Sequence, residues 1–252
     1  MTFLQAVILG AISGLTIFLG MPIARMRDLA KEYVTFLNAI AVGVLFFLFI
    51  DILTHATEPV ETALVAHSGD LPMLLAVLIL GFSAGFLGLV YYGREFLKNE
   101  GRIPAEQLAL LIAIGIGLHN FAEGLAIGSA AHSGELKFAF LLIAGFGLHN
   151  VTEAFGIVAP LAGKRTPWKF LLTAGLIAGG PNVLGTIVGY QFTSDILSVL
   201  FLALAGGAIM YVIGELLAAG RKLSSHTWNG WGLLIGFLAG LLTDFILISL
   251  GA

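Results

Sequence analysis

The sequence GLHNFAE at residues 117–123 returns as GLHNVTE at residues 147–153, and each copy lies inside an apolar run long enough to cross a membrane. Aligning residues 111–127 with residues 141–157 leaves eight of seventeen positions identical. A His and a Glu four residues apart share one face of a helix, about one turn apart. Ionisable side chains at bilayer depth cost about 2.5–3.5 kcal/mol each on insertion scales, so they usually mark a pathway or a site. The two faces together indicate a metal-binding centre inside a membrane.

The composition is that of an integral membrane protein. Hydrophobic residues make up 58% of the chain, charged residues 11%, and the mean hydropathy is +1.00. A soluble domain carries about 25% charged residues. The 252 residues have room for about eight spans of roughly 20 residues each. We therefore expect an all-α membrane protein in which residues 1–252 form a single domain. The absence of cysteine excludes disulfides and a thiolate site for a soft metal such as Cu(I).

Eight apolar runs, bounded by charged or turn residues, predict eight transmembrane helices. The chain lacks the basic n-region of a secretory signal at its start, so the first run is expected to stay as a span. The predicted spans lie at about residues 3–22, 33–54, 72–92, 106–130, 137–163, 168–190, 196–219 and 229–250.

The basic residues alternate between the connections and so predict the orientation. Eleven of the twelve follow the first, third, fifth and seventh spans, and Lys137 is the exception. Short loops rich in Lys and Arg face the cytoplasm. We expect both termini outside, in a multi-pass protein of the plasma (inner) membrane. In this topology His119 and His149 lie near the midplane on antiparallel helices.

The duplicated motif supplies the ligand types of a divalent metal site. Imidazole and carboxylate suit Zn, Fe(II), Mn, Co or Ni, and Asn offers a carbonyl oxygen for harder ions. The set is sufficient for one or two cations, whose charge the carboxylates offset. Hydrogen bonding between helices is the alternative role for His and Asn, but it does not account for two carboxylates at mid-depth. The candidate ligands are His119, Asn120, Glu123, His149, Asn150 and Glu153.

These motifs resemble those of the ZIP family (Zrt-, Irt-like proteins) of divalent metal transporters, in its prokaryotic form. HNFAEGLAIG at residues 119–128 is similar to the fourth-helix motif HNxPEGLAxG, and HNVTEAFGIVAPL at residues 149–161 is similar to the fifth-helix motif. ALAGGAIMYVIGELL at residues 203–217 is similar to the seventh-helix pattern AxAAGxxxYVxxxEL. The eight spans and outside termini also match, so the resemblance extends over the whole chain.

The resemblance implies a mid-membrane metal centre between the fourth and fifth helices. It implies that His119, Glu123, His149 and Glu153 are primary ligands, while Asn120 and Asn150 contribute to an adjacent second position. Glu215 aligns with a carboxylate of the seventh helix, and is either an exit ligand or a helix-end residue. The resemblance also implies a homodimer and a four-helix unit that moves against a scaffold.

The chain departs from the family pattern in the fourth, fifth and sixth helices. Ala122 and Thr152 stand where HNxPE has Pro, so we expect these helices to be straighter. In the sixth helix Gly180 precedes Pro181, whereas many relatives have Glu-Pro there, and Asn182 is the candidate substitute for that carboxylate. The Gly-Gly-Pro stretch at residues 179–181 indicates either a broken helix beside a transport site or a packing kink.

Four further residues are candidates for the metal pathway. Asp51, His55 and Glu58 share a face at the outer end of the second span, and either collect cations or form a solvated helix end. Asp244 lies inside the last span and serves either the pathway or a contact between helices.

The predicted function is transport of a divalent metal towards the cytoplasm by alternating access. Zn is the leading candidate substrate, and the ligand set is also compatible with Fe, Mn, Co and Cd. We expect no resident cofactor, no nucleic-acid partner and no enzyme activity. An intramembrane di-metal enzyme is one alternative, but such sites favour Glu-x-x-His rather than His-x-x-x-Glu. A metal sensor is the other, although the short inside connections offer no output domain.

Overall fold

A computed structural model describes residues 1–25, 31–100, 103–134, 136–163, 165–192, 194–220 and 226–250. Side chains within these ranges are described except at residues 31, 34, 95–100, 136–138, 140–142, 145, 148–149, 152, 219–220, 243–244, 246–248 and 250. The described residues form eight α-helices and no strand, which confirms the all-α fold class. The helices are α1 (Phe3–Leu15), α2 (Lys31–Val65), α3 (Leu71–Glu100), α4 (Ala105–His132), α5 (Leu136–Val158), α6 (Trp168–Gln191), α7 (Asp195–Gly220) and α8 (His226–Leu250). Three short 3-10 helices are η1 (Thr16–Leu19), η2 (Met21–Arg25) and η3 (Ala159–Leu161).

Six segments of the described part are long and apolar enough to cross a membrane. They are Phe3–Arg25, Thr35–Val65, Leu71–Arg94, Ala105–His132, Trp168–Gln191 and Asp195–Ala218. They correspond to the first four predicted spans and to the sixth and seventh. The fifth and eighth spans stay predictions, because parts of α5 and α8 lie outside the described side chains.

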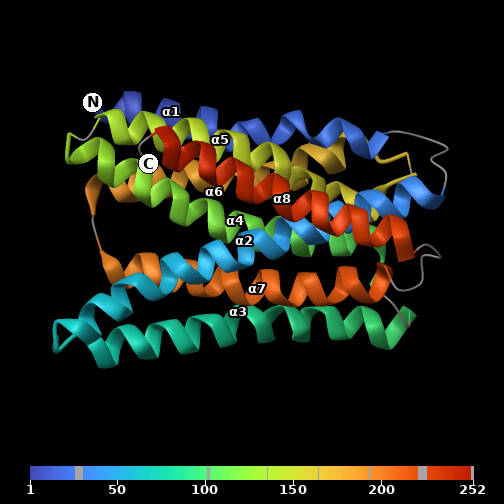
Figure 1. Cartoon of the computed structure of the whole chain (residues 1–252), viewed down its shortest axis with the longest axis horizontal. Coiled ribbons are helices and arrows are strands. Elements are labelled where there is room, and N and C mark those ends of the chain that lie inside the picture. The colour runs from blue at the N-terminus through green and yellow to red at the C-terminus, as the bar shows by residue number, and fades with distance from the viewer. Residues whose placement is uncertain are drawn as a thin grey trace.

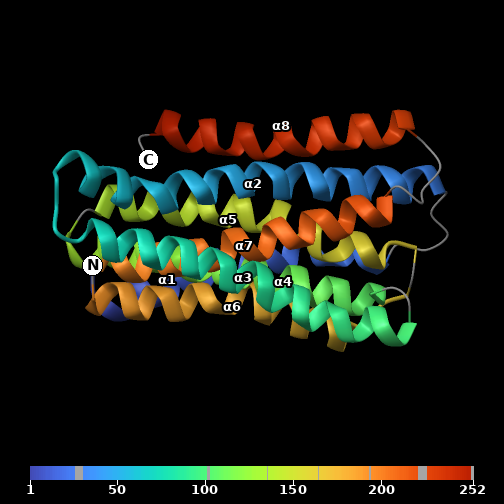
Figure 2. The ribbon, with the colours of Figure 1, turned by 90° about the horizontal axis from the view of Figure 1, so that it is seen from below.

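The helices run side by side along the long axis of the molecule, with α4 in the interior (Figure 1). Helix α4 packs most extensively on α6 and also contacts α7, α5 and α1. On the other side α2 pairs with α8, and α3 pairs with α7. Figure 2 shows α8 and α2 at one edge of the bundle and α6 at the opposite edge. Helices α4 and α5 therefore lie between the two sets of partners.

Glycines bring α4 and α6 into direct backbone contact. A Cβ added at Gly124 would meet the carbonyl oxygen of Asn182, and one added at Gly185 would meet that of Phe121. Only a residue without a side chain permits such an approach. This contact fixes the position of α4, the helix that carries the first His-Asn-x-x-Glu motif.

A Gly185→Ala variant is expected to be less stable than a Gly88→Ala variant by about 1–3 kcal/mol, because the new methyl group overpacks the α4–α6 contact. Gly88 is the matched control: it lies in the interior of a long helix, α3, but a Cβ added there meets no described atom within 4 Å. The helix-propensity gain from Ala is similar at both sites and cancels. The midpoint of thermal unfolding in detergent measures the difference. Equal midpoints for the two variants would contradict the close-packed interface.

The predicted end of the second span at residue 54 is wrong, because α2 continues through Pro59 to Val65. The apolar run does end near Asp51, but the polar residues that follow continue the helix. The first span also differs from a uniform helix. It passes from α1 into 3-10 turns after Leu15, where the Thr16 hydroxyl donates to the carbonyl oxygens of Ser13 at 2.6 Å and Gly147 at 2.7 Å. This contact ties α1 to α5.

Helix α6 is continuous through Pro181, so the broken-helix alternative is wrong. A proline cannot donate to the carbonyl four residues earlier, here that of Ile177. Gly117 of α4 packs directly against this carbonyl, and the Asn120 amide donates to the next one, that of Ala178, at 3.1 Å. Neighbouring helices therefore cover the disturbed turn. Helices α4 and α5 likewise run unbroken through the two positions where the family motif has Pro.

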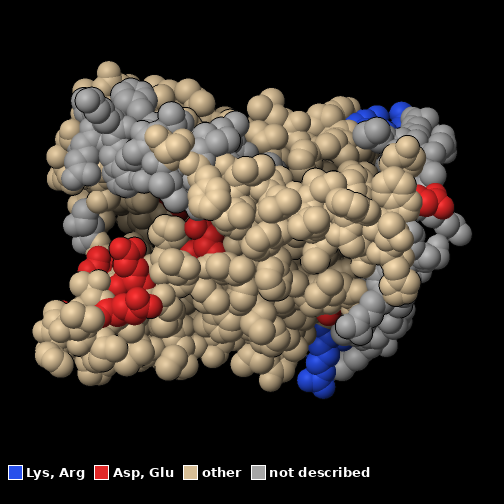
Figure 3. All heavy atoms as spheres, in the orientation of Figure 1, with Lys and Arg blue, Asp and Glu red and all other residues tan. Residues whose placement is uncertain are grey.

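Basic and acidic side chains lie at opposite ends of the bundle. Figure 3 shows Lys and Arg at the end where α2, α4, α6 and α8 begin, while most of the visible Asp and Glu gather at the other end. Both chain termini lie at that acidic end (Figure 1). The separation follows the alternation of basic and acidic connections along the sequence.

Candidate metal centre

Three buried, ionisable side chains meet between α4 and α5. His119 and Glu123 lie one turn apart on α4, and each is 4% exposed. Glu153 comes from the corresponding position of the repeat on α5 and is fully buried. The two helices are antiparallel neighbours, so the polar faces of the two motifs converge in the interior.

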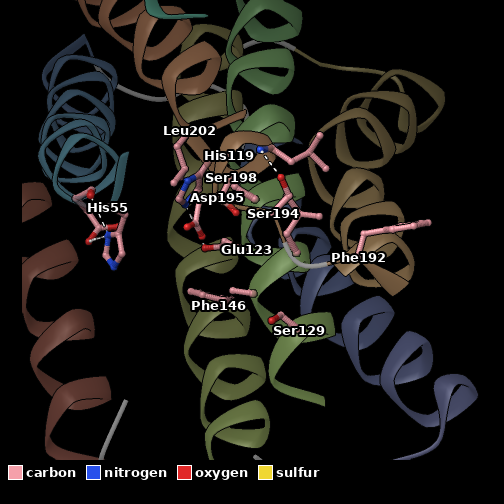
Figure 4. Close-up of a pocket in the computed structure, with 15 residues that line it drawn as sticks. His55, His119, Glu123, Ser129, Phe146, Phe192, Ser194, Asp195, Ser198 and Leu202 are labelled. Carbon is pink, nitrogen blue, oxygen red and sulfur yellow. Dashed lines mark hydrogen bonds and ion pairs between the residues drawn. The ribbon is translucent and has the colours of Figure 1, made fainter. Parts of the chain in front are cut away.

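The ligand atoms of these residues form a compact group. One nitrogen or oxygen atom from each of His119, Glu123 and Glu153 lies within 4.8 Å of the others. The Nε2 atom of His119 is 3.1 Å from a carboxylate oxygen of Glu123 and 3.8 Å from one of Glu153. Figure 4 shows His119 and Glu123 lying together, with His55 on a separate helix. A single small cation can contact all three side chains from the space between them.

The hydrogen-bonding capacity of this group is unsatisfied. Both ring nitrogens of His119 and all four carboxylate oxygens of Glu123 and Glu153 are buried without a hydrogen bond of good geometry to any described group. The Asn120 side chain does lie next to the Glu153 carboxylate. In the described part of the chain, the only ion-pair partner of either carboxylate is His119. One imidazole is not enough to balance two buried carboxylates, and buried charge without a sufficient partner is strongly destabilising. This donor set therefore fits a divalent cation.

Two asparagines brace the group. The side-chain amide of Asn120 donates to the side-chain oxygen of Asn150 at 2.6 Å and also to the backbone oxygen of Ala178 on α6. Asn150 in turn donates to the backbone oxygen of Ser13 at 3.2 Å. The amide groups therefore connect α4, α5, α6 and α1 around the centre. The side-chain oxygen of Asn120 is left without a partner among the described residues.

Asn182 is fully buried, and neither atom of its amide has a hydrogen-bond partner in the described part of the structure. It lies on α6 where this helix contacts α1, because a Cβ added at Gly14 would lie 3.0 Å from the Asn182 Cβ. The hydroxyl of Ser13, on the neighbouring position of α1, is also buried and unpaired among the described residues. The sequence did not determine on which face of its helix Asn182 lies. In the structure its side chain is buried in the interior.

A cavity of about 270 Å³ leads from the acidic end of the bundle to the centre. Its inner wall includes His119 and Glu123, and its outer wall includes Asp51 and His55 of α2. Ser194, Asp195 and Ser198 line it from α7 and the residue before it (Figure 4).

Several predicted residues lie elsewhere. Glu58 is exposed and is not part of the cavity lining. Glu215 lies near the other end of α7, is partly buried, and its carboxylate neighbours the Tyr211 hydroxyl. The side chains of His149 and Asp244 lie outside the described part of the structure, although both residues belong to helices, α5 and α8.

Sequence reasoning missed the roles of Ser13 and Asp195. Asp195 counted only as one of several acidic residues in an outer connection, and its position opposite α2 follows from packing. A serine inside the first apolar run was a weak signal for Ser13, because small polar residues are common at helix contacts.

A comparison with protein families finds one whose description is ZIP Zinc transporter, matching residues 99–250. The match takes in α4 to α8 and begins at the last residues of α3. It contains both His-Asn-x-x-Glu motifs and Asp195, whereas Asp51 and His55 precede it. No curated protein matches the chain.

Proposed function

Because the chain belongs to the ZIP zinc transporter family, we propose that it carries divalent metal cations through the buried centre of His119, Glu123 and Glu153. The observation that carries the proposal is that two buried carboxylates converge on one imidazole, with no Lys or Arg partner among the described residues. A divalent cation supplies the missing charge. Zn²⁺ is the first candidate, and Fe²⁺, Mn²⁺, Co²⁺ and Cd²⁺ are also compatible with nitrogen and oxygen ligands.

The complete ligand set in this proposal includes His149, one turn before Glu153 in the α5 repeat. Asn120 and Asn150 serve a second position beside the primary one. The second position carries no carboxylate of its own from α6, because Gly180 precedes Pro181. Amide oxygens alone hold a dication more weakly than carboxylates do, so we propose that the primary position is the main transport site.

The proposed topology has eight spans, both termini outside, and transport towards the cytoplasm, in a single domain of residues 1–252. The separation of basic and acidic ends supports it, as does the cavity at the acidic end. A plasma (inner) membrane location and a homodimer complete the proposal. Glu215 stays a candidate exit ligand, and Asn182 and Asp244 stay candidates for the metal pathway.

Alternating access is the proposed mechanism. The cavity reaches the centre from the acidic end, whereas buried apolar side chains fill the interior nearer the basic end. Leu45 and Ile112 meet there around Gly156, each within 3.6 Å of a Cβ added at that position. A cation at the centre exchanges its water for imidazole and carboxylate ligands. It leaves when α4 and α5 move against α2 and α7 so that the outer cavity closes and this apolar layer parts.

Net flux separates transport from its rivals, an intramembrane di-metal enzyme and a metal sensor. Purified protein in sealed liposomes is offered Zn²⁺, Fe²⁺, Mn²⁺, Co²⁺ or Mg²⁺ outside, and the metal that accumulates inside is measured. We expect saturable uptake of the transition metals and little uptake of Mg²⁺, which dehydrates reluctantly and prefers an octahedral oxygen shell. Metal binding without accumulation would contradict transport and favour a sensor or an enzyme.

A further inference from the structure

Two membrane-spanning segments that are far apart in sequence are joined at the basic end of the bundle. Arg25 is the last residue of the first of these segments, and Trp168 is the first residue of the segment formed by α6. The guanidinium carbon of Arg25 lies 4.9 Å from the centre of the Trp168 ring. Its Nη1 atom donates to the backbone oxygen of Thr166 at 3.0 Å. A cation is therefore held against an aromatic ring at the boundary of two spans.

The positive charge at this place is not neutralised by described carboxylates. The Arg25 guanidinium has five N–H donors, and only one of them is used in the contact with Thr166. Arg165 and Lys169, which flank Thr166 and Trp168 in the chain, are both exposed. No described Asp or Glu lies within salt-bridge distance of the three cations. Arg25, Arg165 and Lys169, here called the Arg25 cluster, belong to the basic end of the bundle in Figure 3.

An exposed apolar stripe continues from this cluster along α6. Trp168, Leu172 and Leu176 follow one another at intervals of four residues, so they share one face of the helix. Their exposed fractions are 51%, 53% and 57%. Further along the helix, a Cβ added at Gly180 would meet no described atom within 4 Å, and Leu184 is again exposed. No described helix covers this face, which is open to the hydrocarbon of a bilayer.

The combination of cations and an apolar stripe matches an anionic phospholipid better than a free anion. Arginine binds phosphate through paired N–H donors, and basic clusters at the ends of membrane spans attract anionic headgroups. A Trp at the start of a span lies at headgroup level, with its ring against the hydrocarbon. A free anion would contact the cations alone, whereas a phospholipid also covers the stripe below them.

We propose that the Arg25 cluster binds the phosphate of an anionic phospholipid, whose acyl chain lies along Trp168, Leu172 and Leu176. The site is separate from the metal centre and goes beyond the proposed transport function. Because the lipid contacts both Arg25 and the start of α6, it joins the ends of two spans. Both α1 and α6 pack against α4, so the bound lipid stabilises the part of the fold that holds the metal centre.

Thermal unfolding of the purified protein in detergent, with phosphatidylglycerol or phosphatidylcholine added, tests the site. We expect phosphatidylglycerol to raise the unfolding midpoint by about 3–6 °C more than phosphatidylcholine does, because binding to the folded state stabilises it. Arg25→Gln and Lys169→Gln should each lose at least half of this difference between the two lipids. Arg94→Gln is the matched control, since Arg94 is an exposed cation on α3 at the same end, and it should keep the difference.

The difference between lipids is the readout, so any change in the stability of Arg25→Gln without lipid cancels. Equal midpoints with the two lipids in the wild type would overturn the site. A difference that survives in both Arg25→Gln and Lys169→Gln would also overturn it, as would an equal loss in Arg94→Gln, which would indicate general surface charge. Glycerol 3-phosphate carries the phosphate without acyl chains, and an equal shift with it would overturn the lipid in favour of a free anion.

Native mass spectrometry detects the bound lipid directly and keeps the test valid if Arg25→Gln fails to fold. Wild-type protein exposed to both lipids should retain phosphatidylglycerol in preference to phosphatidylcholine, and an Arg165→Gln, Lys169→Gln variant should lose this preference. No preference in the wild type, or the same preference in the variant, would contradict the site. Failure of wild-type Zn²⁺ uptake would instead contradict the proposed function and leave the lipid site standing.

Discussion

Replacing His119 and Glu153 by Ala together reduces Zn²⁺ uptake to the level of protein-free liposomes. The substitution removes the imidazole and the α5 carboxylate from a group whose ligand atoms lie within 4.8 Å of one another. Zinc sites of four ligands bind with roughly 10–16 kcal/mol, so each ligand contributes on the order of 3 kcal/mol, or about 100-fold in affinity. Losing two ligands therefore weakens binding by about four orders of magnitude. Initial uptake rates, measured with a zinc-sensitive dye inside the liposomes, check this result.

The matched control changes the same residue types at exposed sites. His226 begins α8 and Glu61 lies on α2, and both are exposed. A His226→Ala, Glu61→Ala variant should keep uptake within about twofold of the wild type, because exposed charges away from the cavity contribute little. Size-exclusion profiles establish that both variants fold. Uptake above half the wild-type rate in the His119→Ala, Glu153→Ala variant would contradict the proposed centre.

Lowering the pH weakens Zn²⁺ binding steeply. His and Glu bind a metal only when they are deprotonated, so protons compete with Zn²⁺ for His119, Glu123 and Glu153. Affinity falls as pH falls, by about tenfold per pH unit for each proton displaced on binding. Calorimetric titrations between about pH 7.5 and about pH 5.5 measure the slope directly. We expect at least one proton released per metal bound.

The same pH series on the His119→Ala, Glu153→Ala variant separates the centre from other groups. Its residual binding should be weak throughout. Return of the wild-type protein from the lowest pH should restore the original affinity, which excludes unfolding as the cause. Wild-type affinity that does not change with pH would contradict ligation by imidazole and carboxylate.

The features predicted correctly from the sequence are those carried by local patterns. Apolar runs predicted the helices because helix formation at bilayer depth requires a continuous apolar stretch. The repeated His-Asn-x-x-Glu predicted that His119 and Glu123 share a face. The antiparallel arrangement of the two copies predicted that Glu153 would reach the same depth. The structure brings these three side chains together.

The features that the sequence did not predict depend on contacts between distant segments. Helix α2 extends beyond the end of its apolar run. The polar residues that follow stay helical, although their hydropathy does not predict a membrane span there. Helix α6 stays continuous at Pro181 because α4 covers the disturbed turn. Asp195 lines the same cavity as Asp51 only because α7 packs beside α2. The burial of Asn182 depends on contacts with α1 and α4.

Anomalous diffraction at the zinc absorption edge, from crystals of the Zn²⁺-loaded protein, tests the central claim most directly. We predict an anomalous peak between α4 and α5, about 2.0–2.2 Å from a ring nitrogen of His119 and from carboxylate oxygens of Glu123 and Glu153. Crystals of the His119→Ala, Glu153→Ala variant should lack this peak. Zinc bound elsewhere, with no peak between these three side chains, would contradict a metal centre at this position.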